Sequence, residues 1–120
     1  MDTTAIAADF TRLMREDNDA EAQQKYWHDD VVSIEAAPGP HERCEGRAAV
    51  LEKHKWWLEN TTVYSAEVVG PMVNGDQFVV RFIMDAEMTG MPRMKMDEVG
   101  LYTVKDGKIV EERFFYTMDC

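Results

Sequence analysis

The residues of this chain that could do chemistry are carboxylates set among aromatic side chains, in the stretch from Met94 to Tyr116. This stretch reads as two strands joined by a tight turn at Asp106-Gly107, because both central positions of a type I′ hairpin require positive φ. Side chains alternate between the two faces of a strand. One face would therefore carry Glu98, Gly100, Tyr102 and Val104 from the first strand, with Glu112, Phe114 and Tyr116 from the second. Carboxylates among aromatic residues and a glycine are typical of a pocket wall.

Glu98 and Glu112 would face the interior together in this hairpin. Burying two carboxylate charges is costly, so the pair would share a proton or find a cation. Lys53 or His54, on a predicted helix earlier in the chain, is the candidate partner. A purely structural Glu–Lys or Glu–His pair is the competing interpretation, because buried ion networks shift pKa values without doing chemistry.

Glu35 is the other candidate carboxylate, and with Glu98 and Glu112 it completes the predicted catalytic set. It lies in a short predicted strand over 31–36, just before a proline- and glycine-rich loop over 37–46, and such loops often rim a site. In an apolar pocket the charged form of a carboxylate is disfavoured, which raises its pKa towards values useful for a general base. The competing interpretation is a solvated strand end beside a loop.

The elements that must position these carboxylates are helices followed by a run of hairpins. Apolar residues at helical spacing, together with capping and breaking residues, predict helices over residues 3–17, 19–27 and 47–60. From residue 62 the period becomes alternating, and turn signals separate predicted strands over 62–73, 76–89, 93–105 and 108–117. This order favours one α+β domain over residues 1–120, with helices on one face of an antiparallel sheet.

Further side chains predicted to line the interior come from the third helix and the strands. The predicted substrate-binding set is Lys53, His54, Trp57, Phe82, Met84, Tyr102, Phe114 and Tyr116. The two tyrosines would orient a substrate oxygen, although a core tyrosine with its hydroxyl at the mouth fits equally well. The methionine would suit an apolar ligand of irregular shape, and ordinary core filling is the alternative.

Composition excludes several classes of function. The formal net charge of −10 would repel phosphate backbones, so no nucleic-acid partner is expected. No apolar run approaches the ~20 residues that span a bilayer, and the first residues lack the pattern of a signal peptide, so we expect a cytoplasmic protein without a membrane partner. The spacing of His41 and His54 matches no dense metal motif, and no dinucleotide or phosphate-loop fingerprint occurs. Neither a metal nor a cofactor is therefore predicted.

Three local motifs, in this order and spacing, resemble one family over essentially the whole chain. They are Tyr26-Trp27-His28-Asp29-Asp30 before the first strand, Glu45-Gly46-Arg47 opening the third helix, and Asp106-Gly107-Lys108-Ile109-Val110 in the last hairpin. The chain resembles the SnoaL-like branch of the NTF2-like superfamily, whose relatives include ketosteroid isomerases, limonene-epoxide hydrolases, polyketide cyclases and scytalone dehydratase. The resemblance implies a cystatin-like cone, in which three N-terminal helices pack into a curved, mainly antiparallel sheet.

The resemblance also sorts the candidate residues. Steroid isomerases carry their proton-shuttling acid where this chain has Glu35, but their oxyanion acid and tyrosine would fall at Gly100 and near Thr11. Glu98, two residues before Gly100 on the same face, would replace the lost acid. Phe114 stands where an epoxide hydrolase carries an Asp. Neither steroid isomerisation nor epoxide hydrolysis is therefore expected.

The function implied is proton transfer without a cofactor on a small apolar molecule of polyketide, terpenoid or steroid-like character. Isomerisation, dehydration and aldol-type cyclisation all fit, with Glu35 as base and Glu98 or Glu112 as acid. A non-catalytic small-ligand-binding or dimerisation protein is the alternative, because fold alone does not give function.

The outer face of the predicted sheet mixes apolar and charged side chains. These are Val79, Ile83, Val99, Leu101, Ile109 and Phe115, together with Arg81, Asp85, Asp97, Glu111 and Arg113. A monomer would leave the apolar members in water as one patch, and large exposed patches usually mark interfaces. We therefore expect a homodimer joined through this face, with charges pairing across a two-fold axis. The alternative is a monomer whose long Arg and Glu side chains shield the patch.

Overall fold

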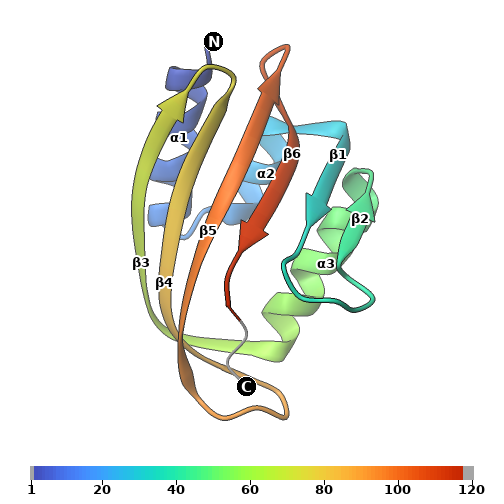
Figure 1. Cartoon of the computed structure of the whole chain (residues 1–120), viewed down its shortest axis with the longest axis vertical. Helices are drawn as coiled ribbons and strands as arrows, with labels where there is room; N and C mark the ends of the chain where they lie inside the picture. Colours follow the sequence, from blue (N-terminus) through green and yellow to red (C-terminus); the bar gives the residue numbers. More distant parts are fainter. Residues whose placement is uncertain (1, 118–120) are drawn as a thin grey trace.

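The computed structural model describes residues 2–117 as helices packed on a single sheet (Figure 1). The elements are α1 (Thr3–Arg15), α2 (Asp19–Tyr26), β1 (Trp27–Ile34), β2 (Arg43–Glu45), α3 (Arg47–Asn60), β3 (Thr61–Asn74), β4 (Gln77–Met88), β5 (Met94–Lys105) and β6 (Lys108–Phe115). The helices lie behind the sheet in the view of Figure 1. This arrangement confirms the predicted α+β class, while the curvature of the sheet stays a prediction.

The strand order β2-β1-β6-β5-β4-β3 places the first strand beside the last one. Strands β3 to β6 form the predicted antiparallel meander, whereas β1 runs parallel to β6, so the sheet is mixed. The parallel pairing sets Ser33 of β1 opposite Glu112 of β6. Residues far apart in the chain are thereby brought to one place in the middle of the sheet.

The first strand differs from its predicted bounds at both ends. It begins at Trp27 rather than at residue 31, because the Trp27 side chain is buried and its backbone pairs with Ile109. It ends at Ile34, so Glu35 lies just beyond it. The segment 37–46, predicted as a loop, contains the short strand β2, whose Cys44 pairs with Ser33 and is buried. Three residues inside a Pro/Gly-rich stretch give too short a pattern to predict a strand.

A β-bulge in the last hairpin corrects one prediction for the outer face. The register shifts between Thr103 and Val104, so that Thr103 pairs with Glu111 but Val104 pairs with Ile109. A bulge inserts one extra residue in one strand and reverses which face the residues beyond it occupy. Ile109 consequently faces the core and is fully buried, not exposed on the outer sheet face.

Aromatic rings hold α1 against the sheet. Phe10 of α1 lies with its ring centroid 4.9 Å from that of Tyr102 and 5.8 Å from that of Phe78. Tyr102 and Phe78, which are paired across β4 and β5, stack with centroids 5.0 Å apart. Aromatic pairs of this kind stabilise a fold beyond the area they bury. Tyr102 is thus anchored at the centre of the core.

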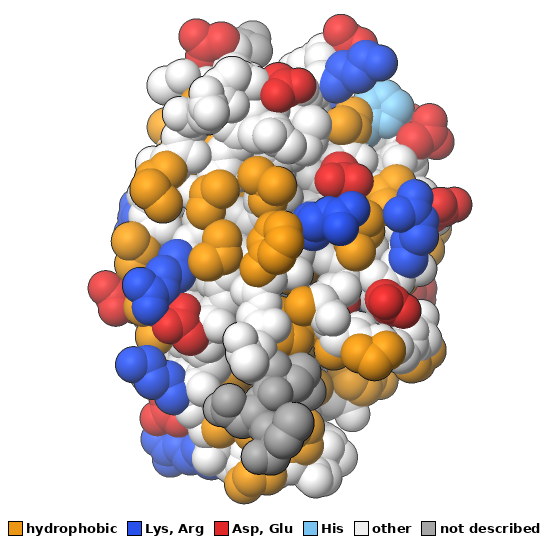
Figure 2. All heavy atoms as spheres, in the orientation of Figure 1, with side chains coloured by type: hydrophobic (Ala, Val, Ile, Leu, Met, Phe, Trp, Pro, Cys, Tyr) orange, Lys and Arg blue, Asp and Glu red, His pale blue; other side chains and the backbone are white. Residues whose placement is uncertain are grey.

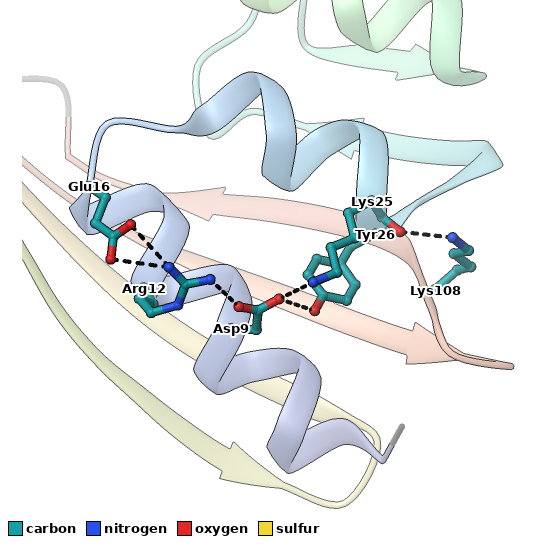
Figure 3. Close-up of polar contacts among 6 residues, drawn as sticks. All are labelled: Asp9, Arg12, Glu16, Lys25, Tyr26 and Lys108. Carbon is teal, nitrogen blue, oxygen red and sulfur yellow. Dashed lines mark hydrogen bonds and ion pairs between the residues drawn. The ribbon is translucent and has the colours of Figure 1, made fainter.

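A polar network on the surface ties α1 to α2 (Figure 3). The Asp9 carboxylate accepts hydrogen bonds from Lys25 and Tyr26 of α2 and from Arg12 of its own helix. The Lys25 and Tyr26 hydrogen bonds, followed by that of Arg12, hold the pKa of Asp9 well below its ordinary value. Within residues 2–117, no helix is long and apolar enough to cross a membrane.

Candidate functional site

A continuous chain of polar contacts connects the predicted carboxylates Glu112 and Glu35. The Ser33 hydroxyl donates a hydrogen bond to Glu112 Oε2 over 2.8 Å, and Lys53 Nζ donates to Ser33 Oγ over 2.6 Å. Lys53 Nζ also pairs with Glu35 Oε1 at 2.7 Å. The Tyr116 hydroxyl donates to Glu35 Oε2 over 3.0 Å. These five side chains form one connected group, which we call the carboxylate chain.

Each member of the carboxylate chain is positioned by a different part of the fold. Ser33 and Glu112 are register partners on the parallel strands β1 and β6. Lys53 comes from α3, where it is one of the few buried side chains. Glu35 follows β1, and its backbone N–H donates to the Glu42 carbonyl over 2.8 Å, which fixes the strand end. Tyr116 follows β6. Glu35 and Tyr116 therefore lie just beyond the ends of two neighbouring parallel strands, and we call this end of the carboxylate chain its mouth.

Glu112 lies at the buried end of the carboxylate chain, with only 7% of its surface exposed. Burial raises the pKa of Glu112 to about 7, while the Ser33 hydrogen bond and the Lys53 charge act in the opposite direction. A carboxyl with such a pKa is partly protonated near neutral pH. It is therefore able to accept or release a proton under physiological conditions.

Glu98 faces the same group of side chains but has no partner of its own. In the described part of the chain its carboxyl makes no hydrogen bond and no ion pair. Burial and then the Glu35 charge, with a smaller effect of Glu112, raise the pKa of Glu98 to about 7 against the opposing charge of Lys53. The charges of Glu35, Lys53 and Glu112 all shift the pKa of Glu98, so the three predicted carboxylates share one electrostatic environment. An unpaired, largely buried carboxyl is a group that a ligand would satisfy.

Gly100 and Tyr102 shape the wall beside Glu98. A Cβ atom at Gly100 would lie 2.9 Å from the Tyr102 hydroxyl oxygen, so the tyrosine fills the space above the glycine. Within residues 2–117 the Tyr102 hydroxyl makes no hydrogen bond. Burial, and then the charges of Glu112 and Glu98, raise the pKa of Tyr102 well above its ordinary value. The hydroxyl therefore stays protonated and is an available donor.

The predicted apolar lining lies in two places. Phe82 is the cross-strand partner of Glu98, and the Phe114 ring lies 5.2 Å from Lys53 Nζ, so both flank the carboxylates. Met84 packs against the core from β4 and also lines an open groove of about 730 Å³ on β3, β4 and β5. None of the three candidate glutamates lines this groove. Trp57 is half-buried on α3.

His54 lies beside Asp19 rather than beside a glutamate of the site, and makes no hydrogen bond to it. Its Nε2 atom lies 3.8 Å from Asp19 Oδ2. Burial, and then the Lys53 charge, lower the pKa of His54, whereas burial raises the pKa of Asp19 to about 6. The Asp19 charge also raises the Tyr102 pKa, so this pair borders the same interior. Lys53 is therefore the cation of the carboxylate chain.

Sequence reasoning missed Ser33 and Asp19 as members of the site. Ser33 and Glu35 have the same parity along the chain, so alternation offered a signal for Ser33. Asp19 has the position of a helix cap in the sequence, and nothing there indicates its contact with His54. In the part of the chain that the structure describes, no cluster of three or more His, Cys, Asp and Glu residues could hold a metal ion.

Comparison with known proteins places this site in a family context. The family model described as "SnoaL-like domain" matches residues 1–116. A structure from Mesorhizobium loti is 49% identical to this chain, with a TM-score of 0.94, and the match covers 97% of this chain and 100% of that one. It is described as a SnoaL-like polyketide cyclase, with carbohydrate phosphatase added in brackets. No functionally curated protein matches the chain significantly.

Two more distant structures share the fold. A Xanthomonas campestris protein described as having a cystatin-like fold is 22% identical, with a TM-score of 0.76, covering 96% of this chain and 90% of its own. A Burkholderia xenovorans NTF2-like protein is 17% identical, with a TM-score of 0.75, covering 94% of this chain and 87% of its own. These similarities support the NTF2-like, cystatin-like fold predicted from the motifs.

Proposed function

Because the chain belongs to the family of SnoaL-like domains, we propose that it is a cofactor-independent enzyme that transfers a proton on a small, largely apolar molecule. The observation that carries the proposal is the difference between two carboxyls in one environment. Glu35 is ion-paired with Lys53, whereas Glu98 has no partner in the described chain and a pKa of about 7. Two carboxyls held in different states divide the work of base and acid.

Glu35 is the proposed base. One of its oxygens pairs with Lys53, and the Tyr116 hydroxyl donates a hydrogen bond to the other. The Glu35 side chain is 22% exposed and that of Lys53 is 11% exposed, so Glu35 is the more accessible partner of the ion pair. It would remove a proton from a carbon or hydroxyl of the substrate.

Glu98 and Tyr102 are the proposed donors to the substrate oxygen that gains charge. A protonated Glu98 would donate one hydrogen bond, and the Tyr102 hydroxyl above Gly100 would donate another. Donors held in a site shielded from water stabilise developing negative charge without having to reorganise. Glu112 is the alternative acid, since its pKa is also about 7. Isomerisation, dehydration and aldol-type cyclisation all follow from these roles.

The proposed substrate is uncharged and of polyketide, terpenoid or steroid-like character. Phe82 and Phe114 supply apolar surface near the carboxylates. The Mesorhizobium relative carries the names of both a polyketide cyclase and a carbohydrate phosphatase. A phosphate would be repelled by the excess of carboxylates over the single lysine in this cluster, which favours the first of these chemistries.

The alternative is a binding protein that does no chemistry. The Glu35–Lys53 ion pair supports it, because a paired base is less available than a free one. In this case Glu98 and Tyr102 would serve only to bind a ligand oxygen.

A metabolite screen by thermal shift, followed by turnover tests on every hit, would separate the two functions. Glu35→Gln and Glu98→Gln should abolish most turnover of a true substrate, while the exposed Glu52→Gln on α3 serves as the matched control. Turnover that persists in both site variants would contradict the proposed roles. Hits that stabilise the wild type but never react would establish the binding protein instead.

We also propose that the protein forms a homodimer through the outer face of the sheet. Figure 2 shows hydrophobic side chains gathered on this face over β3, β4 and β5. The apolar residues that the register places there are Val69, Met72, Val79, Ile83, Val99, Leu101 and Phe115. Three of them, Val69, Met72 and Phe115, are 41%, 66% and 50% exposed, which is costly for a monomer in water.

The charged residues of the same face pair within the chain. Arg81 forms an ion pair with Asp97 at 2.6 Å, and Arg93 pairs with Asp85 at 2.7 Å. The expected pairing of these charges across a two-fold axis is therefore not needed. In the proposed dimer the apolar side chains supply the association.

A further inference from the structure

From Lys53 to the buried end, the hydrogen bonds of the carboxylate chain run in one direction, whereas Glu35 accepts from Lys53. Lys53 donates one N–H to Glu35 and another to the Ser33 oxygen. Ser33 has a single hydroxyl proton, and it donates that proton to Glu112. The serine therefore accepts on one side and donates on the other, which is the arrangement that lets a hydroxyl pass a proton along.

We propose that Lys53 and Ser33 relay protons between Glu35 and Glu112, so that a proton taken up by Glu35 is stored on the buried carboxyl. The inference rests on the proposed proton-transfer function and assigns a role to two residues that would not touch substrate. Ser33 and Lys53 are positioning residues in this scheme, because they act through the two glutamates.

The geometry supports transfer along the whole path. The links from Glu35 to Lys53, from Lys53 to Ser33 and from Ser33 to Glu112 measure 2.7, 2.6 and 2.8 Å, so every step of the path is within hydrogen-bond distance. Ser33 is fully buried, and Lys53 and Glu112 are 9% and 7% exposed. Water has little access to these links, so the protein groups themselves provide the route.

The transfer balances without any additional reactant. Lys53 first passes one of its protons to the Ser33 oxygen, and the neutral amine that remains then takes the proton that Glu35 received from a substrate. Ser33 releases its hydroxyl proton to Glu112. Afterwards Glu35 is again a carboxylate, Lys53 an ammonium group and Ser33 a hydroxyl, and only Glu112 has gained a proton. Transfer in the reverse direction returns the proton to a product, as an isomerisation requires.

The surroundings of Glu112 suit a proton store. The titratable groups that face it are Lys53 on α3, Glu35 after β1, and Glu98 and Tyr102 on β5. Burial and the neighbouring carboxylate favour the protonated form of Glu112, and the pKa of about 7 lets it load and unload near neutral pH. Within the described residues no direct contact joins Glu112 to Glu35, so Ser33 and Lys53 are the connection between them.

Proton exchange at Glu112, measured by NMR on the substrate-free protein, tests the relay. The side-chain carboxyl carbon of Glu112 is assigned with Glu112→Gln, and its relaxation dispersion near pH 7 gives the rate at which the group gains and loses a proton. Ser33→Ala should slow this exchange about 100-fold, a modest value for loss of a positioned proton-transfer group. Ser33→Thr, which keeps a hydroxyl, should restore most of the rate.

Two outcomes would overturn the relay. Exchange in a folded Ser33→Ala variant as fast as in the wild type would show that Glu112 reaches solvent by another route. If Ser33→Ala does not fold, the wild type is measured in mixtures of H₂O and D₂O. A curved dependence on deuterium content is expected when several protons move together, and a linear one would exclude the relay. No substrate is used, so this result is independent of whether turnover is ever found.

Discussion

Tyr102 occupies the space that a side chain at Gly100 would need. The ideal Cβ position at residue 100 lies 2.9 Å from two atoms of the tyrosine, Cε2 and the hydroxyl oxygen. Both residues lie on the inward face of β5, and Tyr102 is held there by Phe78 and Phe10. The glycine is thus required by packing against Tyr102.

Gly100→Ala should destabilise the protein, because the stacked Tyr102 ring cannot move aside without disturbing the core. Overpacking of this kind costs about 1–3 kcal/mol. Urea denaturation would measure the loss in the free energy of unfolding. Adding Tyr102→Phe should recover only part of it, since the ring carbon at 2.9 Å remains. Wild-type stability in Gly100→Ala would show that the ring has room to shift.

Lys53→Met should weaken the fold and change the titration of the neighbouring carboxyls. The substitution leaves Glu35 without its cation, which costs about 3 kcal/mol in a largely buried pair and less here because Glu35 is partly exposed. Lys53 lowers the pKa values of Glu98 and Glu112, so both should rise in the variant. Carbon NMR of the glutamate carboxyls would report this.

The double variant Lys53→Met/Glu35→Gln controls for the loss of the ion pair. It should be more stable than Lys53→Met alone, because no unpaired charge remains at the Glu35 position. Equal stability of the single and double variants would mean that an unpaired Glu35 costs the folded protein nothing.

Stability should fall as the pH rises from about 4.5 to 7. The folded protein raises the pKa values of Glu98 and Glu112 from 4.5 to about 7, so it binds more protons than the unfolded chain in this window. Unfolding free energy decreases with pH wherever the folded state binds more protons. Their stabilising contribution is present in full below pH 4.5 and is lost by about pH 7, with an upper bound on the order of 3 kcal/mol per carboxyl.

Urea denaturation at several pH values between 5 and 8 would measure this slope. Glu98→Gln and Glu112→Gln should each flatten it, because an amide does not titrate. Asp9 acts in the opposite direction, since its lowered pKa adds stability that is lost only in stronger acid. A wild-type stability that rises through this window would contradict the assignment of both glutamates.

Local pattern was sufficient to predict which residues share the inward face of the last hairpin. The pairs Tyr102–Glu112 and Gly100–Phe114 confirm the alternation on which that prediction rests. Beyond the bulge at Thr103 and Val104 the alternation reverses, and for this reason Ile109 was placed on the wrong face. A bulge is defined by the register between two paired strands, so it cannot be predicted from the sequence of either strand alone.

The partners within the site depend on tertiary contacts that no single segment encodes. Lys53 and His54 are neighbours on α3, yet one reaches Glu35 and the other Asp19. Ser33 becomes part of the site only because β1 runs beside β6, a pairing between strands distant in the chain. The carboxylates and their face were therefore predictable, but the carboxylate chain that joins them was not.

Leu101→Glu should convert the proposed homodimer to a monomer. Leu101 lies on the outer sheet face between Val79 of β4 and Arg113 of β6. In a two-fold interface each substitution occurs twice, so two buried carboxylates would lack partners, and an uncompensated buried charge is strongly destabilising.

Light scattering at micromolar concentration would follow the mass of the protein. The wild type should give twice the 13.8 kDa mass of one chain, and Leu101→Glu should give the mass of one chain. Leu51→Glu is the matched control, because Leu51 is 43% exposed on α3, away from the outer sheet face, and should leave the dimer intact. A wild-type mass near 13.8 kDa that does not change with concentration would eliminate the dimer. In that event the alternative holds, in which long Arg and Glu side chains of this face shield the apolar patch from water.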